Sequence, residues 1–186
     1  MKKLLFAIAA LMTMTVANAQ SVKEQIEASQ NTAKELKSLT DKNAKESGAP
    51  EVDAFQKAVN DIAKQATENS DKLKALYEKV SAGGADPEVL KKDMDVVKAG
   101  IEKEVKEFTT AQDKAAAAAK AVADLTSELG SASAMAKIKI AKKLKASTSN
   151  LNTTKDIVSL LVKETANQTN ISSALLKAIT SGAALQ

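Results

Sequence analysis

Residues that interrupt α-helices cluster in three short segments of this chain and are rare elsewhere. They are Ser47-Gly48-Ala49-Pro50, Ala82-Gly83-Gly84-Ala85-Asp86-Pro87, and Gly130 with the Ser131 that follows it. Between these segments, apolar residues recur every three or four positions, which is the spacing of one face of an α-helix. The sequence therefore predicts helices at about 21–47, 51–80, 87–129 and 132–180.

The apolar spacing is most regular in the second predicted helix. Steps of three and four alternate along Val52, Phe55, Val59, Ile62, Ala66, Asn69, Leu73, Leu76 and Val80. This alternation is the heptad spacing of a coiled-coil seam, with Asn69 as its polar member. A buried Asn at such a position sets register or oligomer state, and partial exposure is the alternative for Asn69. In the third helix, two consecutive four-residue steps at Ile101 bring the period closer to 3.6, which favours bundle packing over a long supercoil.

The fold class that follows is all-α, an elongated antiparallel four-helix bundle with coiled-coil-like seams. At ~1.5 Å per residue, the first two helices span roughly 40 to 45 Å and the last two roughly 65 to 75 Å. Helices 3 and 4 are therefore longer than helices 1 and 2, and residues 118–145 are expected to project past the first hairpin as a two-helix tip. The fourth helix is either continuous or interrupted at Ser147-Thr148-Ser149-Asn150, whose side chains compete for backbone hydrogen bonds.

The first 19 residues have the composition of a secretory signal peptide. Two lysines precede a mostly apolar run, Leu4 to Val16, and Ala17-Asn18-Ala19 provides the small side chains that a signal peptidase requires. Cleavage after Ala19 is expected, which leaves residues 20–186 as a single helical-bundle domain. An uncleaved N-terminal anchor is the alternative. The short leader is typical of bacteria, so the predicted location is the periplasm, the cell surface or the outside of the cell.

The composition lacks the residue types that enzymes use most often in catalysis. The chain has no His and no Cys, so the commonest general base, the thiolate nucleophile and the usual zinc ligands are absent. No cofactor or metal site is predicted, and the lack of Arg together with few aromatic residues argues against nucleic acid. Most acidic residues lie off the apolar stripes and are expected to be solvated, with Glu104 as the ambiguous case. An enzyme would need two acids that converge inside the bundle.

A cluster of lysines in the predicted tip is the clearest functional signal. The candidate partner-binding or membrane-binding residues are Lys137, Ile138, Lys139, Ile140, Lys142, Lys143, Leu144 and Lys145. On a helical wheel, Lys139, Lys142 and Lys143 share one face, whereas Lys137 and Lys145 fall within the apolar arc. Such a cluster suits an anionic membrane or an acidic partner, and a merely solvated basic face is the alternative.

Two functional hypotheses remain after these exclusions. The leading one is a non-enzymatic, exported helical bundle that acts through protein–protein interaction at the cell envelope or outside the cell, with homo-oligomer formation left open. The alternative is reversible binding of the tip to a membrane or lipid, with membrane insertion as a variant. Salt sensitivity separates the two, because attraction of exposed lysines to anionic lipid is screened over about 8 to 10 Å near physiological salt.

Overall fold

The structure, a computed structural model, describes residues 21–182 and places most of them in helices. The helices are α2 (Val22–Lys42), α3 (Pro50–Ala82), α4 (Pro87–Ser131) and α5 (Ala134–Ser181), and the described residues contain no strand. α4 and α5, at 45 and 48 residues, are longer than α2 and α3, at 21 and 33. The predicted all-α fold and the order of helix lengths are therefore confirmed. The predicted signal peptide at 1–19 lies outside the described residues.

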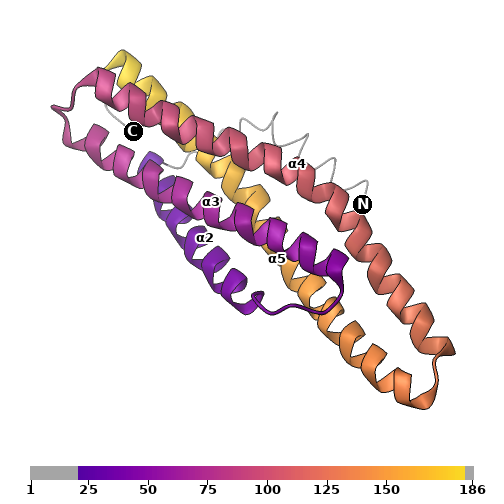
Figure 1. Cartoon of the computed structure of the whole chain (residues 1–186). Helices are drawn as coiled ribbons and strands as arrows, with labels where there is room; N and C mark the ends of the chain where they lie inside the picture. The colour runs from indigo at the N-terminus through magenta and orange to yellow at the C-terminus, as the bar shows by residue number, and fades with distance from the viewer. Residues whose placement is uncertain (1–20, 183–186) are drawn as a thin grey trace.

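Consecutive helices run antiparallel and form an elongated bundle (Figure 1). α3 and α5 each pack against the three other helices, whereas α2 and α4 do not contact each other in this part of the chain. The turn between α4 and α5 lies at the far end of the molecule, beyond the connection between α2 and α3 (Figure 1). At the start of α3, Ala49 and Glu51 line a groove with Ala117 and Lys120 of α4. Residues 118–145, hereafter the tip, therefore project past the first hairpin, as the helix lengths predict.

α2 is shorter than the sequence predicts and ends at Lys42, before the expected boundary at 47. The backbone that follows it is bound by side chains from other helices. Gln56 of α3 donates to the carbonyls of Asn43 and Lys45, and Asn150 of α5 donates to the Lys45 carbonyl at 2.7 Å. Backbone carbonyls must be paired when they are shielded from water, and here tertiary contacts replace the bonds of a further helical turn.

α5 continues without a break through the segment Ser147–Asn150. Ser147 is fully buried, and the side-chain amide of Asn150 donates to the carbonyl of Lys45 and to Gln56 Oε1, both at 2.7 Å. Because this amide binds the α2–α3 connection, it does not compete with the backbone hydrogen bonds of its own helix. The continuous form of the fourth predicted helix is therefore the correct one.

A layer of polar side chains divides the apolar core into two clusters. The cluster on the tip side includes Leu36, Val59, Ile62, Phe108, Leu125, Ile140 and Leu161. The cluster at the opposite end includes Ile26, Leu73, Leu76, Met94, Val97, Ile171 and Leu175. The polar layer between them consists of Ser29, Asn69, Ser70, Glu104, Glu164, Thr165 and Gln168. Asn69 is 1% exposed, so the partial exposure considered for it is wrong and the buried alternative is correct.

Candidate functional site

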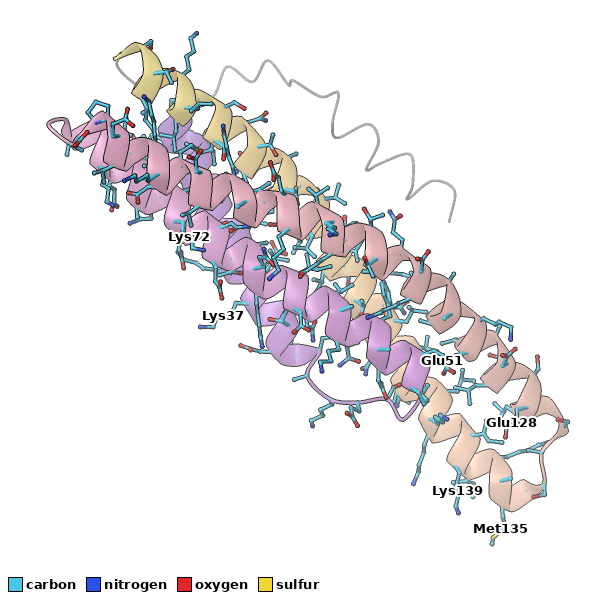
Figure 2. The ribbon with its side chains drawn as sticks, turned by 45° about the horizontal axis from the view of Figure 1, so that its top comes forward. Lys37, Glu51, Lys72, Glu128, Met135 and Lys139 are labelled. Atoms are coloured by element: carbon cyan, nitrogen blue, oxygen red, sulfur yellow. The ribbon has the colours of Figure 1, made fainter. Side chains whose placement is uncertain are left out.

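The tip buries most of its apolar side chains between its own two helices. Leu125 of α4 and Ile140 of α5 are buried, and Leu144 is partly buried against the same cluster. Two large apolar residues remain outside this contact, Met135 at 83% exposure and Ile138 at 62%. Figure 2 shows Met135 and Lys139 pointing away from the bundle at this end of the molecule. The sequence-predicted set is therefore divided, because Ile140 and Leu144 pack inward while Ile138 faces solvent.

Helical spacing places the exposed apolar residues beside three lysines. Met135, Ile138, Lys139 and Lys142 stand at positions i, i+3, i+4 and i+7 of α5, and Lys145 is seven residues after Ile138. Residues with these spacings lie on one face of a helix. All five are exposed, and we call them the basic apolar face. Lys145 thus lies with the exposed cations and not in the buried arc of the helix.

The two other lysines of the predicted set lie outside this face. Lys143 is half-buried and lines the groove at the root of the tip, together with Glu51 of α3 and with Asp124 and Glu128 of α4. This open groove has a volume of about 410 Å³. Lys137 is exposed but lies two positions from Met135, which places it on another side of the helix. The acidic groups of the tip are therefore on α4, and its cations are mostly on α5.

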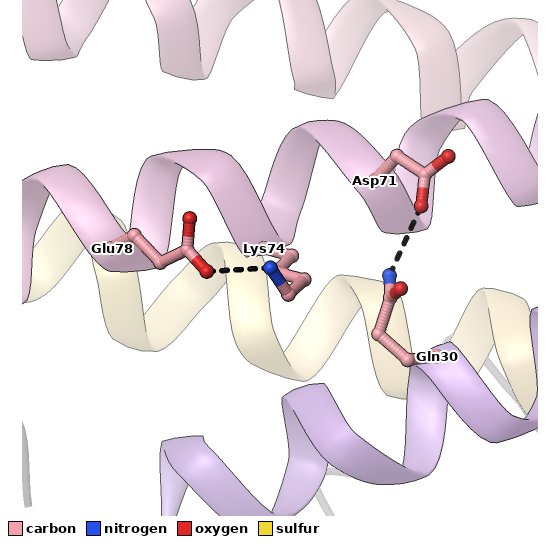
Figure 3. Close-up of polar contacts among 4 residues, drawn as sticks. All are labelled: Gln30, Asp71, Lys74 and Glu78. Atoms are coloured by element: carbon pink, nitrogen blue, oxygen red, sulfur yellow. Dashed lines mark hydrogen bonds and ion pairs between the residues drawn. The ribbon is translucent and has the colours of Figure 1, made fainter.

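Among the described residues, the lysines of the basic apolar face have no acidic partners. Elsewhere on the surface, ion pairs do form, such as Lys74 with Glu78 at 2.5 Å in α3, close to the α2–α3 hydrogen bond from Gln30 to Asp71 (Figure 3). Within residues 21–182, no ion pair involves a lysine of the tip segment 137–145. α5 carries no acidic residue before Asp156. The basic apolar face is therefore a cationic surface without ion pairs among the described residues.

A second cluster of chemically interesting groups lies inside the polar layer around Glu164. One carboxylate oxygen, Oε1, accepts hydrogen bonds from the hydroxyl of Ser29, from Ser70 Oγ at 2.7 Å and from Gln168 Nε2 at 3.0 Å. The side chain is 1% exposed. Burial raises the pKa of Glu164 above its ordinary value because it penalises the charged form, while these hydrogen bonds act in the opposite direction.

Glu104 lies in the same layer and has fewer donors. Thr165 Oγ1 is 2.5 Å from Glu104 Oε1, and Asn69 Nδ2 donates to Oε2 at 3.1 Å. Burial raises the pKa of Glu104 to about 7, and the negative charges of Glu164 and Glu107 act in the same direction, against the hydrogen bonds from Thr165 and Asn69. Glu104, the ambiguous case among the acids, is therefore buried, and Glu164 is an exception to the expectation that the acids are solvated.

The sequence does contain a signal for this layer, in the polar residues that interrupt the apolar stripes of separate helices. Ser29, Asn69 and Gln168 each interrupt an apolar stripe of their own helix, and the fold brings these interruptions to one level. Glu164 precedes the stripe position Thr165 and was not considered as a buried acid. Once three polar interruptions are placed in register, a neighbouring acid becomes a candidate for burial, because buried polar groups require partners.

The described chain contains no group of three or more acidic side chains placed to hold a metal ion. None of its helices combines the length and the hydropathy needed to cross a membrane. Comparison with known proteins found no match to a family model, to a curated protein or to a solved structure.

Proposed function

We propose that this protein is an exported, non-enzymatic helical bundle that docks its tip reversibly on an anionic membrane surface. One observation carries the proposal: Met135 and Ile138 are the exposed apolar residues of a face that also presents Lys139, Lys142 and Lys145. Apolar groups flanked by lysines are the composition that binds at the boundary between lipid headgroups and acyl chains. The bundle holds this face at its far end, so contact with a surface leaves the rest of the molecule free (Figure 1).

The expected binding combines two forces of different range. Each lysine near an anionic surface contributes about 1 kcal/mol, and salt weakens this attraction. Met135 and Ile138 contribute by moving apolar surface out of water, which salt does not screen. Because the tip presents only two such side chains, this contact is reversible and remains at the interface. The proposed mode is therefore peripheral docking, without a transmembrane segment.

The buried acids do not favour an enzyme. Glu104 and Glu164 do converge inside the bundle, which is the arrangement that carboxylate catalysis would require. Their exposed fractions are 0% and 1%, however, and side chains from all four described helices enclose them. A general acid or base must reach the substrate within hydrogen-bond distance. A pair shielded in this way acts on the protein itself and not on a substrate.

Co-sedimentation with vesicles tests the proposed docking. The chain from residue 20 onward is mixed with vesicles of anionic phosphatidylglycerol or of neutral phosphatidylcholine, at low and at high salt. The expected result is pelleting with the anionic vesicles at low salt, reduced at high salt, and none with the neutral vesicles. Absence of pelleting with anionic vesicles at low salt would contradict the proposal.

Two variants locate the contact on the basic apolar face. Replacing Lys139, Lys142 and Lys145 by Gln removes about 3 kcal/mol of attraction and weakens binding roughly 100-fold at low salt. The matched control replaces Lys57, Lys64 and Lys155, which are exposed, unpaired and outside the tip. This control removes the same charge and is expected to bind almost normally. Equal losses in the two triple variants would show that net charge, and not the tip, binds the vesicles.

A protein partner is the second candidate, and a separate observation favours it. Val89 and Val96 of α4 are exposed at 49% and 57%, one heptad apart on the same face. Val96 also lines a shallow groove with Lys72 and Lys79 of α3. Crosslinking from photoreactive groups at 89 and 96 in the native envelope tests this surface. A discrete crosslinked protein would support a partner there, whereas self-contacts alone would count against it.

A further inference from the structure

The hydrogen bonds around Glu104 are completed more fully by a neutral carboxyl group than by a carboxylate. Thr165 Oγ1 lies 2.5 Å from Glu104 Oε1 and 2.8 Å from the Leu161 carbonyl. A hydroxyl has one hydrogen, so it cannot donate to both acceptors at once. If Glu104 is protonated, its own hydrogen can lie on the short contact to Thr165, and the Thr165 hydrogen then reaches Leu161. Every member of this chain of bonds is then satisfied.

The surroundings of Glu104 supply no positive charge. From α3 it meets the neutral side chain of Asn69, and from α5 the neutral Thr165. The charged groups that act on it are Glu164 of α5 and Glu107 of α4, and both are acidic. α2 reaches the layer through the neutral residues Ser29 and Thr32, which contact Glu164. No described lysine forms an ion pair with either buried acid.

The two acids differ in how well they can hold a negative charge. Glu164 Oε1 accepts from three side-chain donors and Glu104 from two. In each set one hydroxyl is shared with a backbone carbonyl, Ser70 with Ala66 and Thr165 with Leu161, so the acids differ in their number of donors. Hydrogen bonds to a carboxylate favour its charged form. If both groups ionise, two negative charges share one layer without a cation, which is costly in an interior of low dielectric constant. The group that keeps a proton is therefore Glu104.

We propose that Glu104 is a proton-binding site that controls how tightly the middle of the bundle is closed. With the proton bound, the hydrogen bonds from Glu104 through Thr165 to the Leu161 carbonyl are complete, and the layer between the two apolar clusters holds at most one charge. When Glu104 releases its proton to water, the layer holds a second charge, and α4 separates locally from α3 and α5 to hydrate it. The position of the layer, between the two clusters, makes this a hinge between the tip half and the opposite half. The inference does not depend on what the tip binds.

A titration of the side-chain carboxyl carbons by NMR tests the assignment directly. With the glutamates labelled with ¹³C at the carboxyl position, the Glu104 signal is expected to change with a midpoint near pH 7. Its assignment comes from the one signal that disappears in Glu104→Gln. A midpoint for Glu104 near the ordinary glutamate value of 4.5 would overturn the proposal. This measurement uses the unaltered protein, so it stays decisive even if a variant folds poorly.

Hydrogen exchange tests whether the proton controls closure. After correction for the intrinsic pH dependence of exchange, amides in 100–108 and 161–168 are expected to open at least about ten-fold more often at pH 8 than at pH 5. Glu104→Gln should remove this difference, because a neutral amide replaces the titrating group. The matched control is Glu102→Gln, two residues away on the same helix and exposed, which should retain it. Equal opening at both pH values in the unaltered protein would show that the layer does not act as a hinge.

Discussion

At the tip, two large apolar side chains face solvent, whereas at the middle of the body two carboxyl groups lie inside the bundle. Apolar side chains are usually buried and carboxyl groups usually exposed, so both placements cost free energy that other interactions must offset. In the polar layer the cost is offset by hydrogen bonds within the protein. On the basic apolar face no group of the described chain provides such compensation. The polar layer is therefore stabilised within the protein, whereas the exposed apolar groups of the tip can be removed from water only by binding to another surface.

The two regions also differ in how many helices enclose them. In the body, side chains meet between α2, α3, α4 and α5, while in the tip only α4 and α5 are present (Figure 1). A two-helix contact shields one stripe of each helix and leaves the other sides in water. Stability should therefore be concentrated in the body, and the tip should tolerate changes that the body does not.

The largest expected effect comes from the same truncation made in each region. Leu161 in the body is completely buried, and Leu125 in the tip is 7% exposed. Leu161→Ala should lower the free energy of unfolding by about 4 kcal/mol, and Leu125→Ala by about 2 kcal/mol, because the tip can collapse or admit water around the removed atoms. Chemical denaturation followed by circular dichroism measures both. A loss at Leu125 as large as the loss at Leu161 would contradict the division between tip and body.

The next effect is a pH dependence that should come from the body alone. A carboxyl group whose pKa is raised in the folded state binds its proton more tightly when folded than when unfolded. Its contribution is therefore fully present below the unfolded value and is lost as pH rises to the folded value. For Glu104, with a folded pKa of about 7 against an ordinary value of 4.5, the free energy of unfolding should fall by about 3 kcal/mol between pH 4.5 and pH 8. The raised pKa of Glu164 acts with the same sign.

Denaturation across this pH range, repeated with two variants, shows which region causes the pH dependence. Glu104→Gln should flatten most of the slope, since it removes the titrating group from the layer. Glu128→Gln in the tip, where the acid is exposed, should leave the slope unchanged. A stability that rises between pH 5 and pH 8 in the unaltered protein would contradict the buried neutral form of Glu104.

The helices and the projecting tip could be predicted because both follow from local information. Breaker positions and apolar spacing depend on residues close together in the sequence, and helix lengths follow from the breakers. The end of α2 could not be predicted in this way. It is determined by Gln56 and Asn150, which bind the backbone after α2 from distant parts of the chain.

The details of both sites required the packing of one helix on another. A helical wheel shows which residues share a face but not which face meets α4, so Ile140 and Leu144 were expected at the docking surface although they pack inward. In the same way, the sequence singles out Asn69 and Glu104 separately, without placing them together. The meeting of polar side chains around Glu104 and Glu164 depends on the register of the helices, which the apolar period leaves open.

The smallest expected effect compares two glycines of α4, one in each region. A Cβ added at Gly100 would overlap Asn69 Oδ1, whereas one added at Gly130 would meet nothing. Gly100→Ala should therefore displace the Asn69 amide from Glu104, and lower the free energy of unfolding by about 1 kcal/mol in spite of the better helix propensity of Ala. Gly130→Ala lacks that conflict and should raise it by roughly 0.5 kcal/mol. Thermal unfolding of the two variants at pH 6 measures the opposite signs. If both substitutions stabilise the protein, the close approach of α3 and α4 at Asn69 is not required for the polar layer, and the layer is looser than the body around it.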